Sequence, residues 1–183
     1  MQSEQRALGE RLTLGVAVAI PQPHATVLTK WRRESGDPAA DLIWPHVTLL
    51  PPTEVPAESL PDVEQHLSAA AATVAPFDMH LSGTGTFRPS SPVVFVQVAR
   101  GVAPCEALER AIRRGPLARE LDFPYHPHVT VAQQVDDAAL DATYEGLSGF
   151  VARFHVTHFV LFHRDGEQRW QWRTEFPLAS PSA

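Results

Sequence analysis

The pattern of hydrophobic and polar residues along this chain is typical of a helix in some stretches and of a strand in others. Leu60, Val63, Leu67 and Ala70 recur at the spacing of one helix face, whereas residues 93–98 form the short apolar run of a buried strand. The pattern therefore predicts a mixed α+β chain. We expect strands at residues 12–20, 42–50, 76–87, 93–98, 127–132, 150–162 and 170–178, and helices at residues 25–34, 58–74, 104–114 and 138–147.

Proline, glycine and the chain ends set the limits of these elements. Pro51 and Pro52 are expected to stop the strand at residues 42–50, because proline cannot donate a hydrogen bond to a sheet. Asp165-Gly166 is a hairpin-type signal between the last two strands. Residues 1–11 and 179–183 are predicted to be a flexible N-terminus and a disordered tail. The remaining residues, 12–178, are predicted to form a single domain.

One six-residue pattern occurs twice, as Pro45-His46-Val47-Thr48-Leu49-Leu50 and as Pro127-His128-Val129-Thr130-Val131-Ala132. In a strand, residues two apart point to the same face of the sheet. Each copy would therefore present a histidine and a threonine on one face and apolar residues on the other. Two such strands placed face to face would bring two imidazoles and two hydroxyls into one cleft.

A third His-Val-Thr tripeptide, at residues 155–157, tests how specific this pattern is. His155 has no proline before it and lies inside the longer alternating run at residues 150–162. We interpret that run as a structural strand, with His155 and Thr157 on its solvated face. The proline and the apolar strand end distinguish the first two copies from this one.

The residues of the paired motif suit acid–base chemistry on a phosphate ester. Histidine titrates near pH ~6.5, so one imidazole can be neutral while another is protonated. His46 and His128 are therefore the candidate catalytic residues, and Thr48 and Thr130 the candidate donors to nonbridging phosphate oxygens. Two histidines could instead bind a metal, but neither motif carries an acidic residue, and catalytic zinc usually has three protein ligands. We expect no metal and no other cofactor.

The two motifs resemble the paired signature motifs of the 2H phosphoesterase superfamily. The group that looks most similar is that of the 2′-5′ RNA ligases and cyclic nucleotide phosphodiesterases. Residues 83–87 and 92–98 resemble the strand pair between the family's motifs, and residues 154–162 and 170–178 resemble its last two strands. The resemblance therefore covers nearly the whole chain, from about residue 12 to residue 178.

This resemblance implies a bilobal fold of two small antiparallel sheets with outer helices around a central cleft. It also implies a pseudo-two-fold internal repeat, and the histidines are indeed 82 positions apart (128 − 46), close to half the chain. The implied activity is metal-independent hydrolysis of 2′,3′-cyclic phosphate ends of RNA or nucleotides, with a 2′-phosphate as the usual product. Ligation of RNA through a 2′-5′ linkage would be the reverse reaction.

The composition of the chain limits the kinds of binding partner that we expect. The chain has 183 residues and a formal net charge of −6, which argues against broad binding of long nucleic acid but not against an RNA end or a nucleotide cyclic phosphate. The single cysteine, Cys105, cannot form an internal disulfide, and this fits a cytoplasmic location. The apolar stretch at residues 14–20 is too short to cross a membrane. We expect a monomer without membrane contact.

Residues outside the motifs could contact the substrate as well. An aromatic ring can stack on a base if one of its faces is exposed, and an arginine can pair with a phosphate. Lys30, Arg32 and Arg33 are interpreted instead as the solvated face of the helix at residues 25–34. The candidate contacts are Phe87, Phe123, Tyr125, His126, Arg88, Arg164 and Arg169.

Three functions remain open at this stage. The first is the cyclic phosphate or 2′-5′ phosphodiesterase described above. The second is a phosphodiesterase that acts on another small cyclic or 2′-5′ linked nucleotide. The third is a non-catalytic module that binds RNA ends in the same cleft, although binding alone would not require a histidine and a threonine in both motifs.

Overall fold

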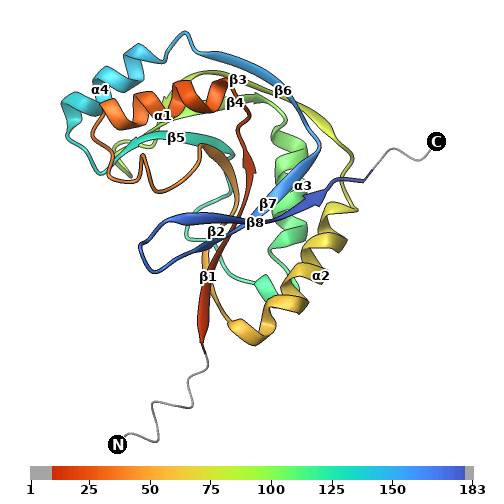
Figure 1. The fold of residues 1–183 in the computed structure, drawn as a ribbon. Coiled ribbons are helices and arrows are strands. Elements are labelled where there is room, and N and C mark those ends of the chain that lie inside the picture. Colours follow the sequence, from red (N-terminus) through yellow and green to blue (C-terminus); the bar gives the residue numbers. More distant parts are fainter. Residues whose placement is uncertain (1–9, 180–183) are drawn as a thin grey trace, which may run out of the picture.

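The computed structural model describes residues 10–179, which fold into two antiparallel sheets and four α-helices (Figure 1). Residues 1–9 and 180–183, which include most of the two predicted flexible ends, lie outside the described residues. The strands are β1 (Arg11–Ala19), β2 (His46–Pro56), β3 (Phe77–Thr86), β4 (Val93–Arg100), β5 (His128–Gln133), β6 (Val151–Val156), β7 (His158–Arg164) and β8 (Trp170–Pro177). The helices are α1 (His24–Glu34), α2 (Leu60–Ala71), α3 (Val102–Ile112) and α4 (Asp137–Gly146), with short 3-10 turns at Ala57–Ser59 and Gly115–Leu117.

Each sheet has four strands, and each has one motif strand at its edge. The first sheet has the order β2-β1-β7-β8 and the second has the order β5-β4-β3-β6. The predicted fold class, two small antiparallel sheets with helices outside, is confirmed. Edge position matters because a strand with a neighbour on one side only leaves its other side free to meet a second sheet.

The internal repeat is visible in the order of the elements. Strand β4 begins 82 positions after β1 (93 − 11), which is the same separation as that of the two motif histidines. The helices cross over between the halves: α1 follows β1 but contacts β5 of the second sheet, and α3 follows β4 but contacts β2 of the first sheet. This exchange ties the two sheets together, with α1 and α4 on one side of the molecule and α2 and α3 on the other (Figure 1).

The predicted strand at residues 42–50 was wrong at both ends, and β2 begins only at His46. Strand β2 continues to Pro56 instead of stopping at Pro51, and the pairing with β1 passes from Leu50 opposite Val16 to Thr53 opposite Leu14. The two prolines, Pro51 and Pro52, lie at this irregularity on an edge strand, where a missing N–H donor is tolerated.

The run at residues 150–162 is also not one strand. It breaks at Thr157 into β6, which pairs with β3 in the second sheet, and β7, which pairs with β1 in the first. The Thr157 carbonyl accepts a hydrogen bond from the Leu178 amide. A continuous hydrophobic alternation does not show that the chain changes sheets, because both pieces bury one face in the same way.

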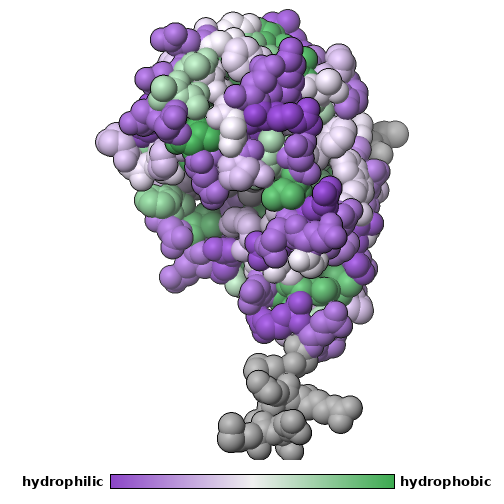
Figure 2. Space-filling model, turned by 60° about the vertical axis from the view of Figure 1, so that its left-hand side comes forward, coloured by the Kyte–Doolittle hydropathy of each residue, from purple (hydrophilic) through white to green (hydrophobic). Residues whose placement is uncertain are grey.

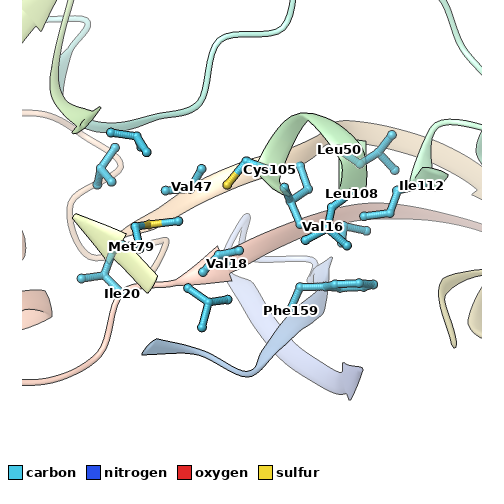
Figure 3. Packing of buried hydrophobic residues seen from close by; sticks show 14 of the residues in the cluster. Val16, Val18, Ile20, Val47, Leu50, Met79, Cys105, Leu108, Ile112 and Phe159 are labelled. Carbon is cyan, nitrogen blue, oxygen red and sulfur yellow. The ribbon is translucent and has the colours of Figure 1, made fainter. Parts of the chain in front are cut away.

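The main hydrophobic core includes residues of both sheets and of all four helices, and Figure 3 shows the part of it around α3. Val16 and Val18 of β1, Leu108 of α3 and Phe159 of β7 are each at most 2% exposed. Side chains of this kind stabilise the fold by about 1.5–3 kcal/mol each when fully buried. Val47 of the first motif also lies in this core, so the face of β2 opposite to His46 is fixed by packing.

The other face of the first sheet carries a second, smaller cluster of Ala17, Val160 and Phe162, with Trp170 packed against it. The β1 residues on this face are small. A Cβ added at Gly15 would lie 3.0 Å from the Trp170 ring, so a side chain there would displace the indole. Small residues on β1 therefore leave room in front of this sheet.

The outer surface is mostly polar. Figure 2 shows one face on which hydrophilic residues predominate and hydrophobic residues form separate small areas. Among the described residues the longest helix is α2, with 12 residues, whereas a helix that spans a bilayer needs about 20. Within residues 10–179, no helix combines the length and the hydropathy needed to cross a membrane.

Candidate active site

The two motif strands meet where the sheets approach each other. Strands β2 and β5 are the edge strands of their sheets and are in contact with one another. Both show the alternation that the sequence predicts: the central Val47 and Val129 are fully buried, while the histidine and threonine on either side keep part of their surface exposed. The partly exposed motif residues are His46, Thr48, His128 and Thr130.

Each motif histidine is held by the same local hydrogen bond. The Nδ1 atom of His46 lies 2.7 Å from the Trp44 carbonyl oxygen, and that of His128 lies 2.7 Å from the His126 carbonyl oxygen. A carbonyl can only accept, so each Nδ1 must carry the proton and donate it. In both neutral imidazoles, Nε2 is then the unprotonated nitrogen, and it is the atom available to exchange a proton with a substrate.

Burial makes both imidazoles hard to protonate in the free protein. The pKa of His46 is lowered to about 4, mainly by burial and to a lesser extent by the charges of Arg32 and His128, against a raising effect of the Trp44 carbonyl. The pKa of His128 is also lowered, mainly by burial and to a lesser extent by the charge of His126, against a raising effect of the His126 carbonyl. The effect of His128 on the pKa of His46 places the two imidazoles close enough for a charge on His128 to disfavour a charge on His46.

The motif residues line two adjoining hollows. His46 lines one of about 340 Å³, and His128 lines one of about 580 Å³. Thr48, Thr130 and Gln133 line both, so the hollows share the wall that carries the two hydroxyl groups. A larger hollow of about 710 Å³ beside α3 contains neither motif histidine nor motif threonine. We therefore take the two adjoining hollows as the candidate cleft.

The two halves of the cleft differ in spite of the repeat. The residue paired with Thr48 across the sheet is Ala17, whereas the residue paired with Thr130 is Phe95. Phe95 packs against Phe87, with ring centroids 4.5 Å apart. The neighbour of Thr48 on the adjacent strand is therefore small, and the neighbour of Thr130 is aromatic.

All of the predicted aromatic contacts lie in the His128 half. Phe87 meets the His128 ring edge-on, at 4.9 Å between centroids, and also meets His126 at 5.6 Å. Phe123 is 74% exposed at the border of this hollow. The Tyr125 hydroxyl donates to the Thr48 carbonyl at 2.8 Å, which links the loop before β5 to the first motif strand.

The predicted arginine contacts lie elsewhere. The Arg88 guanidinium pairs with Asp141 at 2.8 Å and with Asp137 at 3.7 Å, both on α4, and Arg88 lines neither hollow. Arg164 lies 5.8 Å from the centre of the Trp170 ring, and it too lines neither hollow. Arg169 pairs with Glu167 and borders a separate hollow beside the last hairpin.

The third His-Val-Thr tripeptide is remote from the cleft, as expected. The Nδ1 atom of His155 lies 2.8 Å from the Asp78 carboxylate on the outer face of the second sheet. His155 lines neither of the two hollows.

Several residues that line the cleft were not identified from the sequence, among them Gln133 and Arg32. Gln133, at the end of β5, lines both hollows. Arg32 was interpreted as part of a solvated helix face, but it is only 4% exposed and lines the hollow that holds His46. The available signal was its position: Ala25, Leu28 and Arg32 follow the i, i+3, i+7 spacing of a buried helix face, and all three are buried.

The comparisons with known proteins agree with this geometry. The sequence matches the family described as the 2′-5′ RNA ligase superfamily over residues 20–168. A Bacillus cytotoxicus protein named "Putative phosphoesterase" is 32% identical over 153 residues, which cover 82% of this chain and 88% of the relative.

Solved structures show the same fold. Escherichia coli LigT complexed with 3′-AMP aligns with a TM-score of 0.67 at 24% identity, covering 92% of this chain and 99% of LigT. The Thermus thermophilus protein TT0787 aligns with a TM-score of 0.61 at 23% identity, covering 93% of this chain and all of that one. With a family match over most of its length and both histidine motifs in one cleft, the chain belongs to the 2′-5′ RNA ligase superfamily of 2H phosphoesterases.

Proposed function

We propose that the protein is an enzyme that hydrolyses the 2′,3′-cyclic phosphate ends of RNA or of nucleotides by two-histidine acid–base catalysis. The observation that carries the proposal is the matched pair of imidazoles: each donates its Nδ1 proton to a carbonyl and keeps Nε2 for the substrate. Two such groups supply the base that activates water and the acid that protonates the leaving oxygen.

The protonation states of the two histidines favour His46 as the base and His128 as the acid. His46, whose pKa burial lowers to about 4, is neutral in the free enzyme at neutral pH and is ready to accept the proton of the attacking water. His128 would then donate a proton to the 3′ oxygen as the P–O3′ bond breaks, which leaves a 2′-phosphate. The hydroxyls of Thr48 and Thr130 would donate to nonbridging oxygens as negative charge develops there. Ligation, expected above as the reverse reaction, would instead run in the same direction with a 5′ hydroxyl in place of water: His46 would accept the proton of that hydroxyl, and His128 would again protonate the departing 3′ oxygen. The two histidines would exchange roles when the 2′-5′ linkage is cleaved back to the cyclic phosphate.

The relatives support a nucleotide-sized substrate. E. coli LigT, which shares the fold, has been crystallised in complex with 3′-AMP, with NADP+ and with ATP. In this chain, the aromatic groups beside His128 offer a surface on which a base could stack, with Phe87, Tyr125 and Phe123 lining that hollow. His126, which adjoins them, lines it as well.

A panel of esters distinguishes the open alternatives. The purified protein is incubated with 2′,3′-cyclic nucleotides, 3′,5′-cyclic nucleotides and 2′-5′ linked dinucleotides, and the products are assigned by phosphorus NMR. We expect turnover of the 2′,3′-cyclic esters to 2′-phosphates. Turnover of the 3′,5′-cyclic or 2′-5′ linked compounds alone would favour another phosphodiesterase. Binding of all of them without turnover would identify a non-catalytic module.

We expect the reaction to survive treatment with EDTA. The acid–base pair needs no Lewis acid to generate its nucleophile or to protonate its leaving group. Within residues 10–179, no group of three or more His, Cys, Asp or Glu side chains is arranged to bind a metal ion. Initial rates are measured before and after dialysis against EDTA. A complete loss of rate that zinc or manganese restores would contradict the metal-independent mechanism.

A cytoplasmic location, a monomeric state and a single domain spanning residues 12–178 remain predictions from the sequence. Size-exclusion chromatography with light scattering tests the second of these directly.

A further inference from the structure

A buried ion pair lies in the wall of the cleft, outside both histidine motifs. The Arg32 side chain is 5% exposed and that of Asp37 is fully buried, and Nε of Arg32 donates to the Asp37 carboxylate at 2.8 Å. A buried charge is costly unless it is paired and hydrogen-bonded. An arginine kept at this depth beside a reaction site therefore needs a reason beyond the solubility of a helix surface.

The Asp37 carboxylate is fully engaged in holding this arginine. One of its oxygens accepts from Arg32 Nε and from the Gln133 amide at 3.1 Å, and the other accepts from the Ala39 amide at 2.8 Å. These donors come from α1, from the loop that follows it and from β5 of the second sheet. The guanidinium is thus fixed in place before any ligand binds.

The outer part of the guanidinium remains free. Arginine has five N–H donors, and within residues 10–179 only the Nε donor of Arg32 has a hydrogen-bond partner. The Nη atoms are not among the buried polar atoms that lack a partner, so they keep accessible surface. Arg32 lines the hollow that also contains His46, Thr48 and Thr130. The four Nη donors therefore belong to the wall of the candidate cleft.

We propose that Arg32 is a third phosphate-binding group of the cleft, whose Nη donors bind a nonbridging oxygen of the substrate's phosphate beside the two threonines. The identity of the ester rests on the proposed function, whereas the binding of a phosphate group does not. A planar guanidinium already held by one carboxylate is suited to this task, because it can bind the phosphate without losing its first partner. A lysine would serve both partners less well, because its three donors sit on one nitrogen and lack the planar fork of a guanidinium.

The test is the affinity for inorganic phosphate, measured by isothermal titration calorimetry on the full chain. Removing Arg32 alone would leave the Asp37 carboxylate buried without its cation, and this change by itself can prevent folding. We therefore compare the double variant Arg32→Gln/Asp37→Asn with Asp37→Asn, so that the two proteins differ only in the guanidinium. Arg33→Gln is the matched control, because the neighbouring Arg33 is exposed and pairs with Asp41.

We expect the double variant to bind phosphate about 10- to 100-fold more weakly than Asp37→Asn, the usual effect of losing a charge-assisted hydrogen bond. Arg33→Gln should stay within about twofold of the wild type. If the double variant or Asp37→Asn does not fold by circular dichroism, Arg32→Lys is compared with the wild type instead, with an expected loss of about tenfold, because the ammonium stays on Asp37. Unchanged phosphate affinity in the folded variant would overturn the proposal.

This measurement separates the two proposals. A protein that binds phosphate through Arg32 but cleaves no cyclic ester would contradict the proposed function and leave the role of Arg32 intact. A protein that cleaves the cyclic ester and binds phosphate equally well without Arg32 would contradict only the inference about Arg32.

Discussion

Replacing either motif histidine should reduce turnover of a 2′,3′-cyclic nucleotide by about 10²–10⁴-fold, which is the usual contribution of a positioned acid or base. The variants are His46→Ala and His128→Ala. Each removes an imidazole whose Nε2 is the proposed proton carrier. The measurement is kcat for wild type and variants, with folding checked by circular dichroism.

The chain contains a matched control for this experiment. His155→Ala alters the same His-Val-Thr tripeptide, but on the outer face of the second sheet, where the histidine contacts Asp78. Turnover in this variant should be nearly unchanged. The double variant of His46 and His128 should be little slower than either single variant, because residues that act as one unit are not additive. An unaltered rate in a folded His46 or His128 variant would rule out the two-histidine mechanism.

The second large effect should come from the threonines. Thr48→Val and Thr130→Val remove a hydroxyl and keep the β-branched shape that suits a strand. Each should lower kcat by about 10- to 100-fold, less than a histidine variant, because other donors to the phosphate remain. The double variant should lose about 10²–10³-fold.

Whether kcat or KM changes in the threonine variants identifies what the hydroxyls do. Donors that act as charge develops in the transition state lower kcat and kcat/KM together when removed, whereas uniform binding groups raise KM alone. A rise in KM at constant kcat in both threonine variants would mean that the hydroxyls bind the ester but do not stabilise its transition state.

The sequence predicted the local part of the site well. The strand period places His46 and Thr48 on one face and Val47 on the other, and the burial of these residues follows that pattern in both motifs. The period depends only on the backbone geometry of a strand, so one copy of the motif is enough to predict it. The repeat then suggested two such strands in one cleft.

The contacts between elements that are distant in the sequence were harder to predict. No local pattern shows that α1 packs against β5, and this contact is what carries Arg32 into the cleft. A basic residue next to Lys30 and Arg33 is usually solvated, and only its position on the buried helix face marks it as different. The separation of β6 from β7 at Thr157 was missed for a similar reason, since the alternation continues across the break while the chain moves from one sheet to the other.

The pH dependence of kcat/KM tests the central claim most directly, because it reports the essential acid and base of the free enzyme. The base must be neutral, so the rate should rise as the pH increases through the lower apparent pKa. The acid must be protonated, so the rate should fall as the pH increases through the higher one. Burial lowers the pKa of His46 to about 4 and also lowers that of His128, so both limbs should lie below pH ~6.5.

The cyclic phosphodiester stays anionic over this range, so the limbs belong to the coupled histidine pair. We expect a bell-shaped profile that is already declining at about pH 7, and the loss of one limb in the residual activity of each histidine variant. A profile that is flat between about pH 4 and 8, or a bell that persists in both variants, would contradict two-histidine catalysis.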